Sequence, residues 1–355
     1  MSKESVAIVI LNYNGRNHLK EFLPSVLQNT PTYMEVHVAD NGSTDDSLDL
    51  LETSFPNVIV HRLPKNYGFA EGYNQALKNI KSSFYVILNS DVRVTKGWVE
   101  PILRLFESSD SIAAVQPKIR SEQVPDFFEY AGASGGLMDK YGFTFCRGRI
   151  FDDLEKDYGQ HDISKEITWA SGAALFIRAK LFHQFGGFDG DYFAHMEEID
   201  LCWRLRRAGY KIMVEPKSTV YHLGGGTLNY QSAHKTFLNF RNLYSTLLKN
   251  LPGSTVIWII LFRLILDGGA SLLYLSKRRP DLVWAIARAH WAFFLKIPRI
   301  NKKRKATKKL VDDHHIGSPN THAIYPGSIV KEYYINGHKI YNELTHVKKQ
   351  NRNNL

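Results

Sequence analysis

The first 120 residues alternate short apolar runs with segments that repeat apolar side chains at helical spacing. The unbroken run Val6–Leu11 is typical of a strand buried on both faces, whereas Leu19, Phe22 and Leu23 mark one face of a helix. This alternation predicts an α/β fold with a Rossmann-like, mostly parallel, doubly wound sheet flanked by helices. The expected strands are 6–11, 34–39, 58–61, 84–88 and 112–117, and the expected helices are 18–27, 44–51, 70–80 and 96–107.

The pattern is less regular after residue 120. Residues 120–165 are rich in Gly, Asp and aromatic side chains and predict loops. A strand with a glycine break (168–178), a helix (197–208), a strand (211–215) and an amphipathic helix (233–249) are expected next. We therefore divide the chain into one α/β domain at 1–250, with halves of about 1–120 and 121–250, an apolar and basic helical segment at 251–310, and a polar tail at 311–355.

Polar residues follow four of the expected strands at their carboxyl ends. In open parallel sheets these ends meet at one edge, and ligands bind in the crevice outside them. Four loops of this kind are much stronger evidence for one shared site than any single loop. The residues expected there are Asn12, Asn14, Asp40, Asn41, Gly68, Asn74, Asn89, Ser90 and Asp91.

Several of these residues have a definite chemical use. Asp91, at the end of a buried strand, suits a metal ion with oxygen ligands, and Asp40 can accept a hydrogen bond from a pyrimidine N–H. Gly68 and Asn74 flank the start of a helix, where small residues and the helix N-terminus favour phosphate. Taken singly, each residue fits ordinary turn or capping chemistry equally well.

A second centre lies at residues 196–204. Glu197, Glu198 and Asp200 begin an expected helix, where the macrodipole explains part of the acidity. Glu197 and Asp200 face the same way on a regular helix and Glu198 does not, so one acid is expected to act as a catalytic base and another to be structural. His222, before three glycines, is a candidate metal ligand or diphosphate contact, although a lone histidine is more often a structural residue.

The net charge of +10 comes from one segment. The window from Lys277 to Lys309 holds twelve Lys and Arg and a single acid, which indicates an anionic partner. The preceding apolar stretch 255–275 contains Arg263 and Asp267 and predicts an in-plane or re-entrant helix at an anionic membrane surface. A buried core helix with a solvated basic face is the alternative. Nucleic acid is not expected, because the aromatic residues here are tryptophans interleaved with aliphatic residues.

The two cysteines, Cys146 and Cys202, lie far apart in the sequence. They form no CxxC or Cys/His cluster, so no zinc site is expected, and a reducing compartment fits. The N-terminal segment lacks an apolar region long enough for a signal peptide. Together with the basic window, this predicts a peripheral or in-plane position on the cytoplasmic face of the cell membrane.

The motifs resemble glycosyltransferase family 2 of the GT-A fold, and especially its rhamnosyltransferase-like branch. They occur in family order over about residues 5–250, and their order makes the resemblance specific. The matching segments are VAIVILNYNG at 6–15, VADNGSTDDS at 38–47, NYGFAEGYNQ at 66–75, VILNSDVRV at 86–94, WASGAALFIR at 169–178, MEEIDLCWRLRRAGY at 196–210 and YHLGGGT at 221–227.

The resemblance implies an inverting single displacement in which Asn12 and Asp40 help to hold the nucleotide base. Asn89-Ser90-Asp91 would be the family's Asp-x-Asp motif, with Asp91 contacting Mn²⁺ or Mg²⁺. Glu198 would occupy the position of the catalytic base. Two departures matter, since Asn89 replaces the first acid and Glu198 replaces an aspartate, which leaves Glu197 as a rival base.

The resemblance therefore implies a hexosyl- or deoxyhexosyltransferase that moves a sugar, rhamnose among the candidates, from a UDP- or dTDP-linked donor to a glycan or lipid-linked glycan acceptor in cell-surface polysaccharide synthesis. A catalytically silent, membrane-attached nucleotide-sugar-binding module is the alternative. A nicotinamide dehydrogenase is set aside, because Asn12-Tyr13-Asn14-Gly15 stands where a Gly-x-Gly-x-x-Gly motif would be required.

Overall fold

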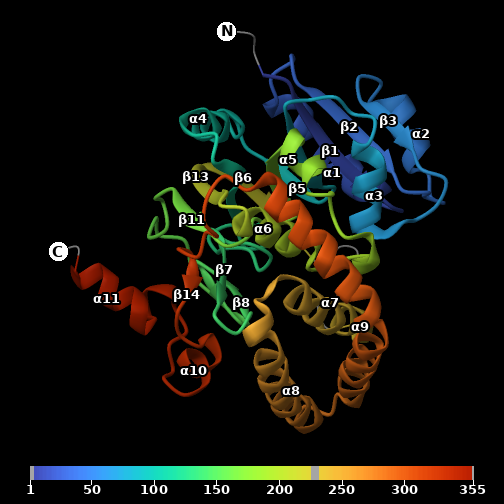
Figure 1. Cartoon of the computed structure of the whole chain (residues 1–355). Coiled ribbons are helices and arrows are strands. Elements are labelled where there is room, and N and C mark those ends of the chain that lie inside the picture. The colour runs from blue at the N-terminus through green and yellow to red at the C-terminus, as the bar shows by residue number, and fades with distance from the viewer. Residues whose placement is uncertain (1–3, 225–231, 354–355) are drawn as a thin grey trace.

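The computed structural model describes residues 4–224 and 232–353, and its centre is a nine-stranded sheet (Figure 1). The first four strands are parallel, in the order β3-β2-β1-β4, which confirms the predicted parallel half. Their bounds are Val6–Asn12 (β1), Glu35–Asp40 (β2), Ile59–Arg62 (β3) and Phe84–Asn89 (β4). The helices between them are Arg16–Asn29 (α1), Ser47–Ser54 (α2) and Gly68–Leu77 (α3).

The central strand β1 is apolar throughout because both of its faces are covered. Val6, Ile8 and Ile10 belong to one buried apolar cluster, whereas Ala7 and Val9 belong to the cluster on the opposite side of the sheet. Successive side chains of a strand point to opposite faces. The unbroken apolar run in the sequence is therefore the signature of a sheet with helices on both sides.

The other half of the sheet departs from a simple doubly wound order. Strand β12 (Ala174–Arg178) lies between β4 and β6 (Ile112–Ser121) and is antiparallel to both. The expected strand at 168–178 is thus shortened to its second part. The strand is interrupted at the glycine break, because the Ser171 backbone N–H donates to the Gln116 side chain and not to a neighbouring strand. Strand β6 then pairs in parallel with β13 (Lys211–His222), and β11 (Lys165–Ile167) forms the edge.

Strand β13 is longer than predicted and ends beside the loop that follows β4. An irregularity between Glu215 and Thr219 interrupts its register with β6, after which the pairing continues to His222. The short strand β5 (Val92–Val94) pairs with this last part of β13, and His222 lies opposite Val92. Asp91 directly precedes Val92, so the topology brings His222 next to Asp91.

A second, five-stranded sheet replaces the loops expected at 120–165, and the C-terminal region completes it. Strand β14 (Ile324–Tyr325) pairs in parallel with β7 (Gly136–Asp139), and Leu344 and Val347 are buried in the main core. Residues 311–355 are therefore not simply a polar tail. The remaining elements are Thr144–Cys146 (β8), Arg149–Ile150 (β9), Asp153–Leu154 (β10), Ile329–Tyr334 (α10), Tyr341–Glu343 (η2) and Thr345–Asn353 (α11).

The helices after β13 form an arm that projects below the sheet (Figure 1). Helix α7 (Ala233–Asn250) packs along α9 (Pro280–His314), and α8 (Gly253–Ser276) forms a hairpin with the first half of α9. Within the described part of the chain, α8 is the one helix long and apolar enough to cross a membrane. The other helices are Glu100–Ser108 (α4), Ala179–Gln184 (α5), Gly190–Tyr192 (η1) and Glu197–Arg207 (α6).

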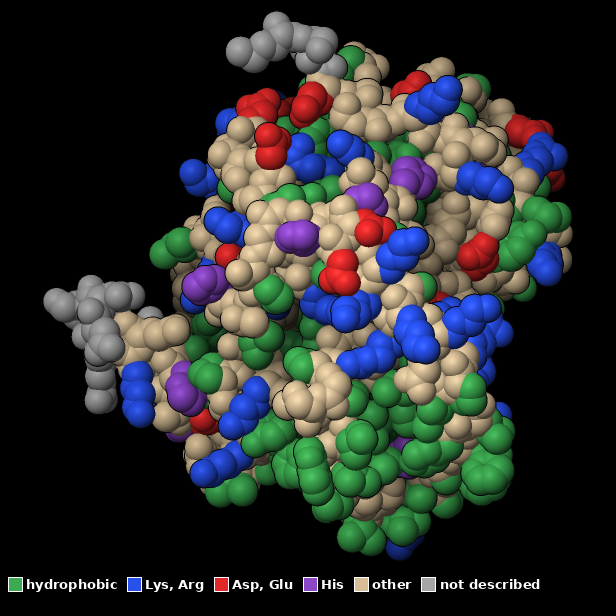
Figure 2. All heavy atoms as spheres, viewed as in Figure 1, with side chains coloured by type: hydrophobic (Ala, Val, Ile, Leu, Met, Phe, Trp, Pro, Cys, Tyr) green, Lys and Arg blue, Asp and Glu red, His purple; other side chains and the backbone are tan. Residues whose placement is uncertain are grey.

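The hairpin displays its apolar side chains outward. Figure 2 shows hydrophobic side chains over the lower part of the molecule, with Lys and Arg gathered directly above them. Trp258 is 73% exposed, Trp284 66% and Trp291 68%. Arg263 and Asp267 instead point inward: Asp267 accepts hydrogen bonds from Tyr244 and from His290. The charged residues of α8 are thus hidden from its apolar outer face.

Candidate active site

Hydrogen bonds join the carboxyl ends of β1 and β2. The Asn12 amide donates to the Asp40 carboxylate at 3.0 Å and to the Ser43 hydroxyl at 3.2 Å, and the Ser43 backbone N–H donates to Asp40 at 3.0 Å. Asn12 Oδ1 is buried and has no hydrogen-bond partner among residues 4–224 and 232–353. A Cβ on Gly15 would lie 2.5 Å from that oxygen. The site thus leaves open an acceptor that a nucleotide base can use.

Asn14 and Asn41 brace the neighbouring turns. Asn14 has a φ of 49° and its side-chain oxygen accepts from the Thr44 N–H at 2.7 Å. The Asn41 amide donates to the Asn66 side chain and to the Gly68 carbonyl, each at 3.1 Å. In this structure both side chains hold the turns around Asp40.

The phosphate role predicted for Gly68 and Asn74 does not fit the structure. The Phe69 and Ala70 N–H groups, at the start of α3, both donate to the Phe193 carbonyl, at 2.6 and 3.1 Å. The Gly68 N–H donates to the Asn66 side chain at 2.8 Å. Asn74 donates to the Phe188 carbonyl and accepts from its N–H, both at 2.9 Å. A helix N-terminus attracts anions through free N–H groups, and here the protein itself fills them.

The loop after β4 brings three groups together with His222. His222 Nε2 lies 3.2 Å from Asp91 Oδ1 and 3.4 Å from Asn89 Nδ2. Burial lowers the pKa of His222, but the nearby Glu129 and Asp91 carboxylates outweigh it and raise the pKa to about 10. Ser90 points toward β1, with its hydroxyl 3.8 Å from the position of a Cβ on Gly15. The fourth and first loops of the rim therefore meet, as the sequence predicts.

Glu129 is a residue that the sequence analysis missed. Its carboxylate lies 3.3 Å from His222 Nδ1, on the side of the ring opposite Asp91, and it also accepts from the Ala131 N–H. A carboxylate behind a histidine ring fixes the orientation of a ligating imidazole. Glu129 stands alone in a loop-like stretch, so no spacing or neighbouring motif in the sequence marks it.

The donor set at Asp91 and His222 fits a divalent cation that binds together with a diphosphate. Among the described residues, no group of three or more His, Cys, Asp and Glu side chains is arranged as a metal site formed by protein alone. Mg²⁺ and similar ions commonly use one or two protein ligands and complete their shell with substrate phosphates and water. A carboxylate and an imidazole, braced by Glu129, match that arrangement once a cation displaces the proton that His222 carries because of its raised pKa.

The start of α6 presents two acids, of which Glu197 is buried and Glu198 partly buried. One oxygen each of Glu197 and Glu198 is buried without a hydrogen-bond partner in the part of the chain that the structure describes. Burial raises the pKa of Glu198 to about 7. Burial, followed by the charge of Glu198, raises the pKa of Glu197 well above its usual range. Strongly shifted acids of this kind are typical of catalytic sites.

A strained segment leads into these acids. Phe193, His195 and Met196 have φ values of 64°, 70° and 75°, a conformation that is costly for residues other than glycine. Asn242 holds the segment, because its amide donates to the carbonyls of Tyr192, Ala194 and His195 at 2.8–3.0 Å.

Asp200 belongs to a structural network and not to the reacting groups. It is completely buried and accepts from Arg204 at 3.0 Å, from Lys249 at 2.8 Å and from Asn250 at 2.7 Å. These hydrogen bonds tie α6 to α7. This corrects the prediction that places Asp200 among the catalytic acids, since a carboxylate held by two cations is not available as a base.

Solved structures with a similar fold bind nucleotide sugars. The chain resembles GalNAc-T7 solved with UDP, GalNAc and Mn²⁺, with a TM-score of 0.53 and 17% identity over 69% of this chain and 47% of that one. It also resembles TarS of S. aureus in complex with UDP-GlcNAc, with a TM-score of 0.52 and 15% identity over 91% and 99% of the two chains. The chain therefore has the fold of these GT-A structures.

The family follows from the sequence comparison. The model described as glycosyl transferase family 2 matches residues 7–184, and the chain belongs to this family. It is 27% identical over 233 residues to N-acetylglucosaminyl-diphospho-decaprenol L-rhamnosyltransferase of Mycobacterium tuberculosis, covering 61% of this chain and 75% of that protein. It is 23% identical over 225 residues to rhamnosyltransferase WbbL of Escherichia coli, covering 61% and 83%. These relatives support the rhamnosyltransferase-like branch and a hexosyl- or deoxyhexosyltransferase.

Proposed function

We propose that this protein is an inverting, cation-dependent glycosyltransferase that moves a sugar from a nucleoside diphosphate to a lipid-linked glycan. The observation that supports this most is the Glu198 carboxylate, which is partly buried, has an unpaired oxygen within the described residues, and has its pKa raised to about 7. A general base works best when its pKa lies near the working pH. An ordinary surface glutamate is a much weaker base.

In the proposed step, Glu198 takes the proton from an acceptor hydroxyl as that oxygen attacks the anomeric carbon of the donor sugar. The bond between this carbon and the phosphate oxygen breaks, and the nucleoside diphosphate leaves with the bonding electrons. A single displacement of this kind inverts the anomeric centre. Glu197, whose pKa is raised further, stays protonated beside it and serves as a hydrogen-bond donor.

The donor would bind along the rim formed by β1, β2 and β4. Asn12 offers a free buried oxygen to the base, and Asp40, hydrogen-bonded to Asn12 and Ser43, fixes its orientation. A Mn²⁺ or Mg²⁺ ion held by Asp91 and His222 would neutralise charge on the leaving diphosphate. Glu129 would keep the His222 ring in place for that ion.

The relatives suggest the substrates. Two are named as rhamnosyltransferases, and one name specifies an N-acetylglucosaminyl-diphospho-decaprenol acceptor. By analogy, the donor proposed here is dTDP- or UDP-linked, with rhamnose as the first candidate, and the acceptor is a glycan on a lipid diphosphate used in cell-surface polysaccharide synthesis. The family and fold alone do not select among sugars.

A lipid-linked acceptor requires access to a membrane. The outward apolar face of the α8–α9 hairpin, with Trp258, Trp284 and Trp291 exposed, and the basic residues of α9 above it (Figure 2) support peripheral or in-plane attachment at the cytoplasmic membrane surface. Tryptophan favours the interface between lipid and water, and each basic residue near anionic lipid contributes about 1 kcal/mol.

The test is transfer by the purified full chain with a panel of UDP- and dTDP-sugars and a short-chain lipid diphosphate N-acetylglucosamine acceptor. We expect a glycosylated lipid with inverted anomeric configuration for one donor. The Glu198→Gln variant should bind the same nucleotide but give no product. Binding without transfer by the unmodified chain, for every donor, would favour the silent binding module instead.

A further inference from the structure

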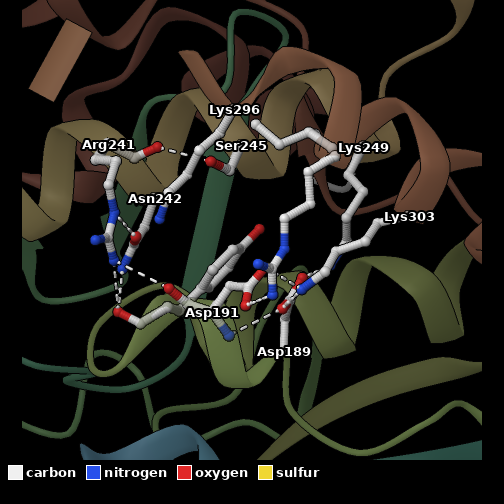
Figure 3. Close-up of a pocket in the computed structure, with 11 residues that line it drawn as sticks. Asp189, Asp191, Arg241, Asn242, Ser245, Lys249, Lys296 and Lys303 are labelled. Carbon is white, nitrogen blue, oxygen red and sulfur yellow. Dashed lines mark hydrogen bonds and ion pairs between the residues drawn. The ribbon is translucent and has the colours of Figure 1, made fainter. Parts of the chain in front are cut away.

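A basic pocket lies between the loop before α6 and the helices α7 and α9, away from Asp91 and Glu198. Five cations line it: Arg241 and Lys249 from α7, and Lys296, Arg299 and Lys303 from α9. Figure 3 shows Arg241, Lys249, Lys296 and Lys303 reaching from the two helices toward the loop that carries Asp189 and Asp191. The enclosed cavity is about 20 Å³, so a larger group would bind at its open mouth.

Two carboxylates only partly neutralise these cations. Asp189 pairs with Lys249 at 2.7 Å and also with Lys303, and Asp191 pairs with Arg299 at 2.5 Å and with Lys303 at 2.6 Å. Of the five cations, Lys249, Lys303 and Arg299 pair with these two acids, whereas Arg241 and Lys296 have no ion pair with an acid among the residues that the structure describes. Clustered cations repel one another unless an anion is present, so the excess indicates an anionic ligand.

Lys296 is the clearest sign of a missing partner. Its ammonium group has neither a hydrogen bond nor an ion pair with any of the residues that the structure describes, although it lines the pocket. Burial, and then repulsion by Arg241, lower the pKa of Lys296. The Arg241 guanidinium donates to the carbonyls of Asp191 and Tyr192, which fixes its position at the wall. A lysine held among other cations is costly unless it binds a negative charge.

The pocket adjoins both the apolar hairpin and the acids of α6. Trp291 and Leu295 are exposed on α9 one to two turns before Arg299, so the apolar surface continues up to the mouth of the pocket. On the inner side, Lys249 binds Asp189 in the pocket and Asp200, two residues after Glu198. A ligand with a long apolar tail and an anionic head would therefore lie along the hairpin with its head in the pocket, next to the Lys249–Asp200 pair that holds the start of α6.

We propose that this pocket binds the diphosphate of the lipid-linked acceptor, an inference that rests on the proposed function. Two phosphate groups linked to a lipid and a sugar carry charges that match the excess of cations. Lys296 and Arg299 would donate to the phosphate oxygens, while the lipid chain lies against the outer face of α9. The sugar beyond the diphosphate would then extend toward Glu198.

The first experiment measures binding of farnesyl diphosphate to the full chain by titration calorimetry. Lys296→Gln combined with Arg299→Gln should weaken binding about tenfold or more, because charge-assisted hydrogen bonds to phosphate are lost. Lys302→Gln, an exposed lysine on the same helix outside the pocket, is the matched control and should leave the Kd unchanged. Equal Kd values for the pocket variant and the control would overturn the proposal.

The second experiment compares two acceptors of the same sugar, one on a farnesyl diphosphate and one on a neutral octyl group. The pocket variant should raise KM for the diphosphate acceptor about tenfold and leave kcat/KM for the neutral acceptor unchanged. An equal loss for both acceptors would contradict a diphosphate site. If the chain transfers no sugar at all, the proposed function fails, whereas the calorimetric result still decides whether the pocket binds a diphosphate lipid.

A third measurement distinguishes binding of the acceptor diphosphate in the pocket from binding of membrane lipid headgroups there. The control for this measurement is Lys302→Gln with Lys305→Gln, which removes two exposed lysines, as many charges as the pocket variant loses. Because neither variant loses a specific membrane contact, vesicles of phosphatidylglycerol should bind the two equally. A selective loss of vesicle binding in the pocket variant, with displacement of farnesyl diphosphate by the vesicles, would make the pocket a headgroup site and overturn the acceptor assignment.

Discussion

The carboxylates on the nucleotide side of the rim and those at the start of α6 differ in how their oxygens are hydrogen-bonded. At the ends of β1 and β2, Asp40 has hydrogen bonds to both carboxylate oxygens, from Asn12 and from the Ser43 N–H. At the start of α6, Glu197 and Glu198 each keep a buried oxygen unpaired with respect to residues 4–224 and 232–353. The hydrogen bonds of the first region fix its shape. In the second region burial makes the charged carboxylates unfavourable, and taking up a proton from the reaction relieves that cost.

The substitution expected to have the largest effect is Glu198→Gln. It removes the proposed base without changing the size of the side chain, so kcat should fall about 10³-fold, within the range known for general bases. Glu197→Gln keeps a hydrogen-bond donor and should cost much less. Steady-state transfer assays on both variants decide between the two acids, and the reverse ranking would make Glu197 the base.

The same acid should set the pH dependence. With its pKa raised to about 7, Glu198 must lose its proton to act, so kcat/KM of the unmodified protein should rise with pH through about 7. The folded protein binds this proton more tightly than the unfolded chain, so Glu198 reduces stability as pH rises from about 4.5 to 7. Glu198→Gln should therefore raise the melting temperature more at pH 8 than at pH 5, and an equal change at both pH values would contradict the raised pKa.

Asp91→Asn should have the next largest effect, and it acts on the other region. Removal of the carboxylate should weaken cation-dependent nucleotide binding about 10- to 100-fold, as does loss of a group that supports a metal. Thermal shifts with UDP and with dTDP, each with and without Mn²⁺, measure this. Ser90→Ala is the neighbouring control, and a full Mn²⁺-dependent shift in Asp91→Asn would remove the proposed ion site.

Asn242→Ala tests whether the strained segment positions the acids. The substitution removes the donor to three backbone carbonyls and should cost about 1–3 kcal/mol in the free energy of unfolding. Because the segment leads into Glu197 and Glu198, kcat should fall about tenfold while the KM for the nucleotide sugar changes little. Asn242→Gln tests rescue, and a loss of stability with unchanged kcat would leave Asn242 with a structural role alone.

The smallest expected effect concerns the hairpin. Trp284→Ser with Trp291→Ser removes two exposed interfacial side chains and should weaken sedimentation with anionic vesicles several-fold, since the remaining apolar and basic residues still bind. Tyr158→Ser is the control, because Tyr158 is 79% exposed and lies outside the arm. Equal binding by the two variants would argue for a protein partner at this face in place of lipid.

The parallel half of the sheet and its rim follow from local patterns, which is why the sequence predicts them. An unbroken apolar run such as Val6–Leu11 indicates that both faces of the strand are covered. The Asn12–Asp40 contact follows from the pairing of adjacent parallel strands. The pairing of β14 with β7 joins residues nearly two hundred positions apart. The paired parts of these strands are only two residues long and have no pattern of their own, so no local rule predicts that contact.

The corrections within the site have the same origin. Gly68 and Asn74 have the residue types of a phosphate loop, and only the position of Phe193 shows that the N–H groups behind them are filled. Asp200 has the spacing of a catalytic acid, and only the approach of Lys249 and Asn250 from α7 reveals its structural role. In both cases the deciding partner comes from a distant segment, so residue type and spacing could not identify it.

The carbonyl of Phe193 has a consequence for how the two substrates communicate. It receives two N–H groups from the start of α3 on the donor side and belongs to the segment that leads into the base. A displacement of that segment therefore frees two N–H groups on the donor side. An anion that binds these N–H groups in turn shifts the segment and the base. Donor and acceptor binding should accordingly be thermodynamically linked through one peptide group, and the enzyme should show ordered addition of its substrates.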